Sequence, residues 1–162
     1  DIFVDVRNAS AAPYEYSTGN AFPFQQWHCL TMVYDGSQGT AADRIKVWID
    51  GTETSMTSVG TNPSSMGAND RSFDVASSEG GLYGDVRIAA YAFAPSTIWT
   101  DTQIKNWCRA PTSIPDGVGL LTLSLGVDSP ELDLSGNART GTVTGATESF
   151  DGPQIFLPGG MQ

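Results

Sequence analysis

The feature that most constrains the fold is a short alternating segment that runs directly into an Asp-Gly pair. Three β-branched residues on one face alternate with other side chains: Ile45, Val47 and Ile49. This two-residue period is that of a β-strand. Asp50 and Gly51 follow, and this dipeptide is typical of the tight turn of a β-hairpin. We therefore expect a strand over residues 44–50 and an antiparallel return over residues 53–59.

The same pattern recurs along the chain, interrupted by segments rich in Gly, Pro, Ser and Asn. Further strands are predicted over residues 2–7, 14–16, 27–34, 71–76, 82–93, 120–125 and 141–145. Loops are expected over residues 37–43 and 60–70, and a turn over residues 77–81. About nine or ten short strands favour an antiparallel β-sandwich.

One helix is expected within this β pattern. Thr100 with Gln103 three residues later fits a capping box, which predicts the start of a helix. Ile104 and Trp107 then fall on one helical face, and Pro111 ends the segment. A single short helix should lie at the periphery of the sandwich.

Composition limits the partners of this chain. Its 162 residues suit one domain, and 18 Gly and 9 Pro agree with many tight turns. The net charge of -10 repels phosphate, so nucleic acid and anionic membranes are poor partners. No apolar run reaches the length of a membrane span. The two cysteines, Cys29 and Cys108, allow one bridge; buried free thiols are the favoured interpretation and a disulfide is the alternative.

Three motifs in order resemble a known family. Trp27-His28 precedes Val33-Tyr34-Asp35-Gly36, then Val47-Trp48-Ile49-Asp50-Gly51 follows, and Gly84-Asp85-Val86-Arg87-Ile88 stands before the helix. Together they resemble the concanavalin A-like lectin and glucanase superfamily, in its laminin-G-like or pentraxin-type branch. The resemblance implies a jelly-roll sandwich of two antiparallel sheets, as in phage and environmental surface proteins.

The chain departs from that family at both ends. Only 26 residues precede Trp27, where the family has several strands, so either the N-terminal strands are truncated or the C-terminal segment supplies them. A segment similar to the family's early strands, residues 133–145, stands instead near the C-terminus. We expect residues 1–110 to form the laminin-G-like sandwich. Residues 111–162 would complete it or form an interface.

Catalytic constellations of the fold are incomplete. Glucanases of this family carry Glu-x-Asp-x-x-Glu on one strand, and here Glu131 and Asp133 are followed by Gly136 in place of the second Glu. The sole histidine, His28, lies in a structural motif, so packing is favoured over a catalytic base. We therefore expect no enzymatic activity.

Candidate binding residues are few. Trp48, Tyr83 and Tyr91 are aromatic side chains that could stack on sugars, although a covered Trp48 is the favoured interpretation. Glu131, Asp133 and Asn137 resemble part of the legume-lectin metal loop. They are too few for a calcium site by themselves, and turn capping explains them better. We expect no cofactor, with calcium as the one metal to test.

The sequence thus predicts a non-catalytic recognition module of an extracellular or virion-surface protein. A glycan is the ligand class that the resemblance implies. The alternative is a structural virion protein, such as a capsid decoration, fibre or tail component, that binds protein surfaces or its own copies. A glycoside hydrolase is the remote third hypothesis.

Overall fold

The computed structural model describes residues 3–5, 14–16, 26–66, 77–78, 82–83, 88–111, 117–123, 133–139 and 141. Within these residues the chain forms ten β-strands, one α-helix and one 3-10 turn, and every strand pair is antiparallel. This confirms the predicted all-β antiparallel class with one short helix. No helix in the described part is long and apolar enough to cross a membrane.

The chain divides into two compact units, each described by itself. The first combines Asp1–Asn69 with Ile98–Ala110, and the second combines Asp70–Thr97 with Pro111–Gln162. The division at residue 110 that the sequence analysis made between a sandwich and a C-terminal part stays a prediction.

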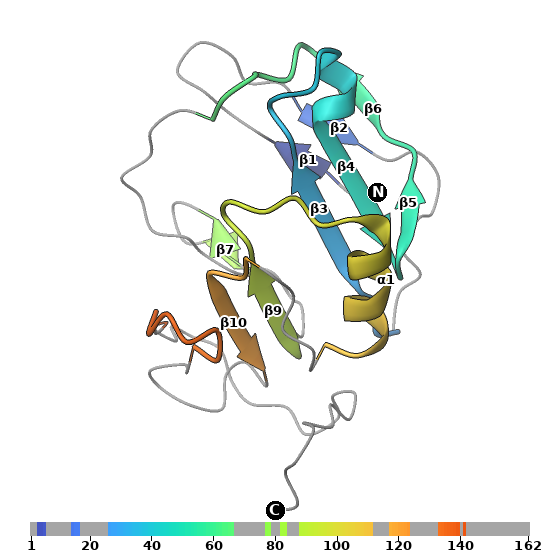
Figure 1. Cartoon of the computed structure of the whole chain (residues 1–162). Helices are drawn as coiled ribbons and strands as arrows, with labels where there is room; N and C mark the ends of the chain where they lie inside the picture. Colours follow the sequence, from blue (N-terminus) through green and yellow to red (C-terminus); the bar gives the residue numbers. More distant parts are fainter. Residues whose placement is uncertain are drawn as a thin grey trace, which may run out of the picture. The chain divides into compact units, whose positions relative to one another are not determined.

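The central sheet of the first unit has the strand order β3-β4-β5 (Figure 1). These strands span Leu30–Tyr34, Ile45–Ile49 and Thr52–Thr54. Asp50 and Gly51 join β4 to β5 with φ values of 52° and 78°. Two consecutive left-handed residues make the tight turn whose twist matches that of the strands, and Asp and Gly tolerate this conformation best. The predicted hairpin is confirmed.

Strand β3 is shorter than predicted, because it begins at Leu30 and not at Trp27. Leu30 pairs with Ile49, the last residue of β4. In an antiparallel register the next residue back, Cys29, lies opposite Asp50, which is already in the turn. The ladder therefore ends where its partner strand ends.

A second sheet of the same unit has the strand order β1-β2-β6. Its strands span Phe3–Asp5, Tyr14–Tyr16 and Thr57–Val59. The predicted single return strand over residues 53–59 is therefore wrong. It is divided at Ser55 and Met56, so that β5 pairs with β4 and β6 pairs with β2.

One hydrophobic cluster of the first unit joins side chains from both sheets. Val4 of β1 clusters with Ile45 and Val47 of β4, and Tyr34 and Met56 pack against them. Val47 is fully buried. Burying a side chain of this size contributes about 1.5–3 kcal/mol. This explains why the alternation in β4 is the clearest strand signal of the sequence: one face of the strand supplies two of the three buried residues of this cluster.

Helix α1 spans Asp101–Arg109 and begins as predicted. The Thr100 hydroxyl accepts from the Gln103 amide, and the Gln103 side chain accepts from the Thr100 amide, which completes the capping box. Ile104 and Trp107 are buried. Figure 1 shows α1 alongside the β3-β4-β5 sheet. A Cβ at Gly51 would lie 3.0 Å from Cγ of Lys105, so the hairpin turn packs closely against the helix.

The interpretation of the cysteines as free thiols is wrong, because Cys29 and Cys108 form a disulfide. Their Cα atoms are 5.4 Å apart, although the residues are separated by 79 positions in the sequence. Sequence reasoning weighed the thiols as isolated small side chains, whereas the packing of α1 on the hairpin brings them together. Closing so long a loop reduces the entropy of the unfolded chain and stabilises the fold by about 4 kcal/mol.

In the described residues of the second unit, two antiparallel strand pairs are found. One joins β7 (Ser77–Ser78) to β8 (Leu82–Tyr83), and the other joins β9 (Ala90–Phe93) to β10 (Leu120–Leu123). The predicted turn over residues 77–81 thus begins with a short strand. The strand predicted over residues 82–93 is described only at its two ends. The strand predicted over residues 71–76, and all of residues 141–145 except Gly141, lie outside the described residues.

Candidate functional site

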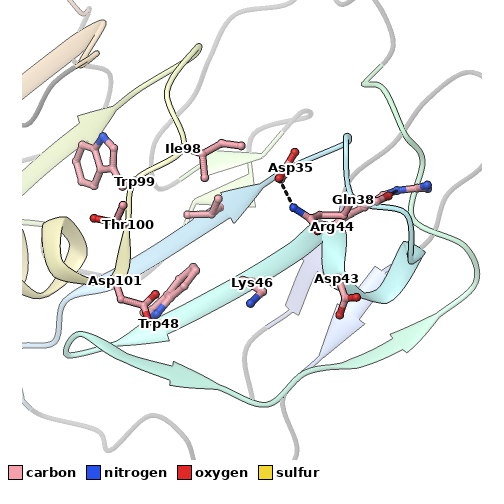
Figure 2. Close-up of a pocket in the computed structure, with 11 residues that line it drawn as sticks. Asp35, Gln38, Asp43, Arg44, Lys46, Trp48, Ile98, Trp99, Thr100 and Asp101 are labelled. Atoms are coloured by element: carbon pink, nitrogen blue, oxygen red, sulfur yellow. Dashed lines mark hydrogen bonds between the residues drawn. The ribbon is translucent and has the colours of Figure 1, made fainter.

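A cleft lies on the face of β3 and β4 that points away from the core (Figure 2). Strand alternation sends Ile45 and Val47 inward, so Lys46 and Trp48 emerge on the opposite face. Val33 of β3 is the register partner of Lys46 and shares that face. These side chains form the floor of the cleft.

One wall of the cleft comes from residues 98–101, the segment that leads into α1. Ile98 is 53% exposed, whereas Trp99 is buried. The Trp99 ring packs against Trp107 of α1 with centroids 6.0 Å apart and a tilt of 57°. Tilted aromatic pairs of this kind are favourable, and this pair fixes Trp99 to the helix. Thr100 and Asp101 complete the wall at the helix N-terminus.

The third side is formed by the turn after β3 and the 3-10 turn Ala41–Arg44. It contributes Asp35, Gln38, Asp43 and Arg44. The cleft has a volume of about 210 Å³. Pockets for drug-sized ligands hold roughly 300–1,000 Å³, so this cleft suits one small ring or the end of a polymer.

Asp35 shapes the turn at the cleft edge. Its carboxylate accepts from the Ser37 hydroxyl at 2.6 Å, from the Gln38 side-chain amide at 2.5 Å and from the Ser37 backbone amide at 3.0 Å. These hydrogen bonds, that of the Ser37 hydroxyl foremost, hold the pKa of Asp35 below its usual value. An ionised carboxylate engaged by three donors is a structural anchor and a poor proton donor.

The two cations of the cleft are both held by the protein. Arg44 donates from Nε to the Gln38 carbonyl at 3.0 Å and from Nη1 to the Asn62 carbonyl at 2.5 Å. Nζ of Lys46 lies 3.3 Å from a carboxylate oxygen of Glu53 on β5. The cleft therefore presents two positioned cations among three carboxylates, those of Asp35, Asp43 and Asp101.

His28 and Asp50 form a separate structural pair that does not line the cleft. Nδ1 of His28 lies 2.8 Å from Oδ2 of Asp50, and Oδ1 accepts from the Cys29 amide at 2.9 Å. The Asp50 amide donates in turn to the Cys29 carbonyl at 2.8 Å. Reciprocal bonds of this kind fix the start of β3 to the hairpin turn, and the His28 side chain is only 7% exposed. The packing interpretation of His28 agrees with this geometry.

The aromatic candidates from the sequence are found in different places. Trp48 lies in the floor of the cleft but is only 3% exposed, as expected for a covered residue. Tyr91 is in β9, and burial raises its pKa. Tyr83 is in β8, and its side chain lies outside the description. Neither tyrosine is among the residues that line the cleft.

Two of the three metal candidates, Asp133 and Asn137, form hydrogen bonds that explain them as loop residues of the second unit. Asp133 accepts the backbone amides of Ser135 at 2.8 Å and Arg139 at 2.9 Å through its two oxygens. Asn137 donates from Nδ2 to the carbonyls of Val118 and Gly119 at 3.2 and 3.3 Å. Glu131 lies outside the described residues. In the part of the chain that is described, no three His, Cys, Asp or Glu side chains gather as metal ligands.

Sequence reasoning identified only Trp48 among the cleft residues. Strand alternation placed it on the outer face, and this was the available signal. Lys46 shares the outer face of β4 with Trp48, but the residues of the turns after β3 and of the segment 98–101, 50 residues further along the chain, are linked to them by no local pattern. Comparison with protein-family models, with curated proteins and with solved structures gives no match.

Proposed function

We propose that this chain is a non-catalytic recognition module that binds a neutral glycan in the cleft on the outer face of β3 and β4. Its fold would be a concanavalin-like jelly roll, on an extracellular or virion surface. The observation that carries the proposal is the mixed lining of the cleft, in which apolar and hydrogen-bonding side chains meet around a small volume.

A sugar ring needs such a mixture. Its C–H faces are apolar and its hydroxyl groups both donate and accept. The cleft offers apolar surface from Val33, Trp48 and Ile98, donors from Lys46 and acceptors from Asp101. Trp48 and Trp99 are too buried to act as open stacking platforms. The contact with the ring would instead come mainly from exposed Ile98.

Charge favours a neutral ligand over an anionic one. Three carboxylates and two cations line the cleft, and the whole chain carries a net charge of -10. Sulfated or uronic-acid glycans would approach against this field. The proposal also includes that the cleft does not hydrolyse its ligand. It is supported for one of the three carboxylates, because Asp35 is engaged by hydrogen-bond donors and unsuited to general-acid work.

The test is an array of neutral and anionic glycans probed with the wild-type protein and two matched variants. Ile98→Ala removes exposed apolar surface at the cleft, while Met66→Ala does the same at a residue that is 61% exposed and does not line it. We expect Ile98→Ala to weaken neutral-glycan binding about tenfold, which corresponds to about 1.4 kcal/mol. Met66→Ala should leave it unchanged. Equal losses in both variants, or release of reducing sugar, would contradict the proposal.

The second candidate, a structural component of a virion, is favoured by one other observation. Leu30 and Met32 are each 52% exposed, although they stand on the core-side face of β3 beside Ile49 and Val47. An apolar strand at the edge of a sheet is a typical site of protein association. Two results together would support this candidate over the first: the protein forms stable oligomers at low micromolar concentration, and it binds no glycan on the array.

A further inference from the structure

We propose that the Cys29–Cys108 disulfide positions one wall of the cleft, so that reduction of the bridge opens the cleft while the sheet beneath it stays folded. The inference concerns the regulation of the cleft and rests on the proposed function only in taking the cleft as the binding site.

The floor of the cleft and the wall formed by residues 98–101 are distant in the chain. Trp48 belongs to β4, and Trp99 belongs to the segment before α1. The intervening residues Asp70–Thr97 belong to the other compact unit. Residues 98–101 lead directly into α1, so the position of this wall is coupled to that of the helix.

Helix α1 is fastened to the sheet near its C-terminal end. Cys108 is bonded to Cys29, and Lys105 packs closely against Gly51 of the hairpin turn. Cys29 is itself fixed, because it exchanges two hydrogen bonds with Asp50. The bridge thus connects the last turn of α1 to a residue that is hydrogen-bonded to the hairpin turn.

Because the bridge holds the C-terminal end of α1, it also positions the N-terminal end of the helix, which lies at the cleft. A helix of nine residues is about 13 Å long, and its capped N-terminus carries Thr100 and Asp101 into the cleft wall. Trp99 moves with it, because its ring packs on Trp107. An isolated helix this short is marginal in water. Without the covalent bond, the docking of the helix would depend on packing, that of Ile104 and Trp107 and that of Lys105 against Gly51.

Reduction is chemically simple. A dithiol such as dithiothreitol transfers two electrons and two protons to the bridge, which becomes two thiols, and the dithiol closes to a cyclic disulfide. Both cysteines are partly exposed. Opening the bridge breaks no hydrogen bond of the β3-β4 ladder, since that ladder begins one residue later at Leu30.

The test uses the four tryptophans of the chain. Trp27 is 41% exposed, and replacing it in the variant Trp27→Phe leaves three buried reporters: Trp48, Trp99 and Trp107. Acrylamide quenching of their fluorescence is compared between the oxidised protein, the dithiothreitol-treated protein and the double variant Cys29→Ser/Cys108→Ser. Amide hydrogen exchange is followed in parallel for β4 and α1.

We expect weak quenching in the oxidised protein and strong quenching in both bridge-free forms. Amides of α1 should lose protection, whereas those of β4 should keep it. Unchanged quenching would overturn the inference, and so would loss of protection in β4 together with α1, because the bridge would then hold the whole unit. The readout needs no glycan. A cleft that opens on reduction in a protein that binds no glycan would refute the proposed function alone.

Discussion

Nδ1 of His28 lies 2.8 Å from Oδ2 of Asp50, and this contact joins the start of β3 to the turn after β4. An ionised carboxylate can only accept, so Nδ1 carries the hydrogen. The same carboxylate accepts the Cys29 amide, next to the disulfide. The sequence predicted structural roles for His28 and Asp50 separately, and the structure shows that the two side chains bind each other.

The contact between His28 and Asp50 leads us to expect that the protein loses stability in acid. Partial burial by itself raises the pKa of Asp50, but hydrogen bonds from the Cys29 amide and His28, with the charge of His28, outweigh it and lower the pKa below its usual value. A depressed carboxyl pKa contributes stability above the unfolded-state value and loses it as the pH falls through the folded-state value. The free energy of unfolding should therefore decline below about pH 4.

Urea unfolding over a pH series measures this for the wild type and Asp50→Asn. At neutral pH the variant should be less stable by about 1 kcal/mol, the contribution of a hydrogen bond to a charged group at a partly exposed site. The difference should shrink toward acid. Glu53→Gln, which alters the exposed pair with Lys46, is the matched control and should cost less than about 0.5 kcal/mol. A difference for Asp50→Asn that does not change with pH would refute the assignment.

Gly51 should resist substitution. It has a φ of 78°, and an added Cβ would lie 3.0 Å from Cγ and 3.2 Å from Cα of Lys105. Left-handed strain costs about 1–2 kcal/mol for an L-residue, and α1 would also have to shift. We expect Gly51→Ala to destabilise the protein by about 2 kcal/mol in urea unfolding. Gly39→Ala, where nothing lies within 4 Å, should change stability by less than about 0.5 kcal/mol. Equal effects would be inconsistent with the described packing of the turn.

Asn137 distinguishes a structural loop from a calcium site. Its amide donates to the carbonyls of Val118 and Gly119, both of which are buried residues. Asn137→Asp replaces the donor by a carboxylate that faces these oxygens, so the free energy of unfolding should fall by about 1–3 kcal/mol. Asn137→Ala should cost a similar amount. Thermal unfolding with millimolar calcium or with a chelator checks the alternative, because at a calcium site the added carboxylate of Asn137→Asp would raise the unfolding temperature when calcium is present.

Local signals allowed much of the fold to be predicted. Asp50-Gly51 specifies its turn through backbone conformation, and Thr100 with Gln103 specifies the helix start through two hydrogen bonds. These interactions are complete within four residues. The division of the strand predicted over residues 53–59 depends instead on which distant strand each half pairs with.

The candidate site could be predicted less well than the fold, because it too depends on contacts between residues that are distant in the sequence. Trp48 could be placed on the outer face of β4, but its neighbours Trp99 and Asp101 reach the cleft only through the docking of α1. That docking includes a disulfide between residues 79 positions apart. The hydrophobic periodicity of the sequence does not indicate such pairings, because contacts between distant residues depend on how the helix packs on the sheet.

The central claim, that the cleft between β4 and residues 98–101 binds a neutral glycan, is tested most directly by the indole N–H signals in a nitrogen–proton NMR titration. The four tryptophans give four signals, of which those of Trp48 and Trp99 report on the cleft and that of Trp27 reports on an exposed surface outside it. Addition of neutral oligosaccharides should shift the Trp48 and Trp99 signals in a saturable way and leave the Trp27 signal in place. Signals that stay unchanged across the whole neutral panel, or a shift confined to Trp27, would contradict the account.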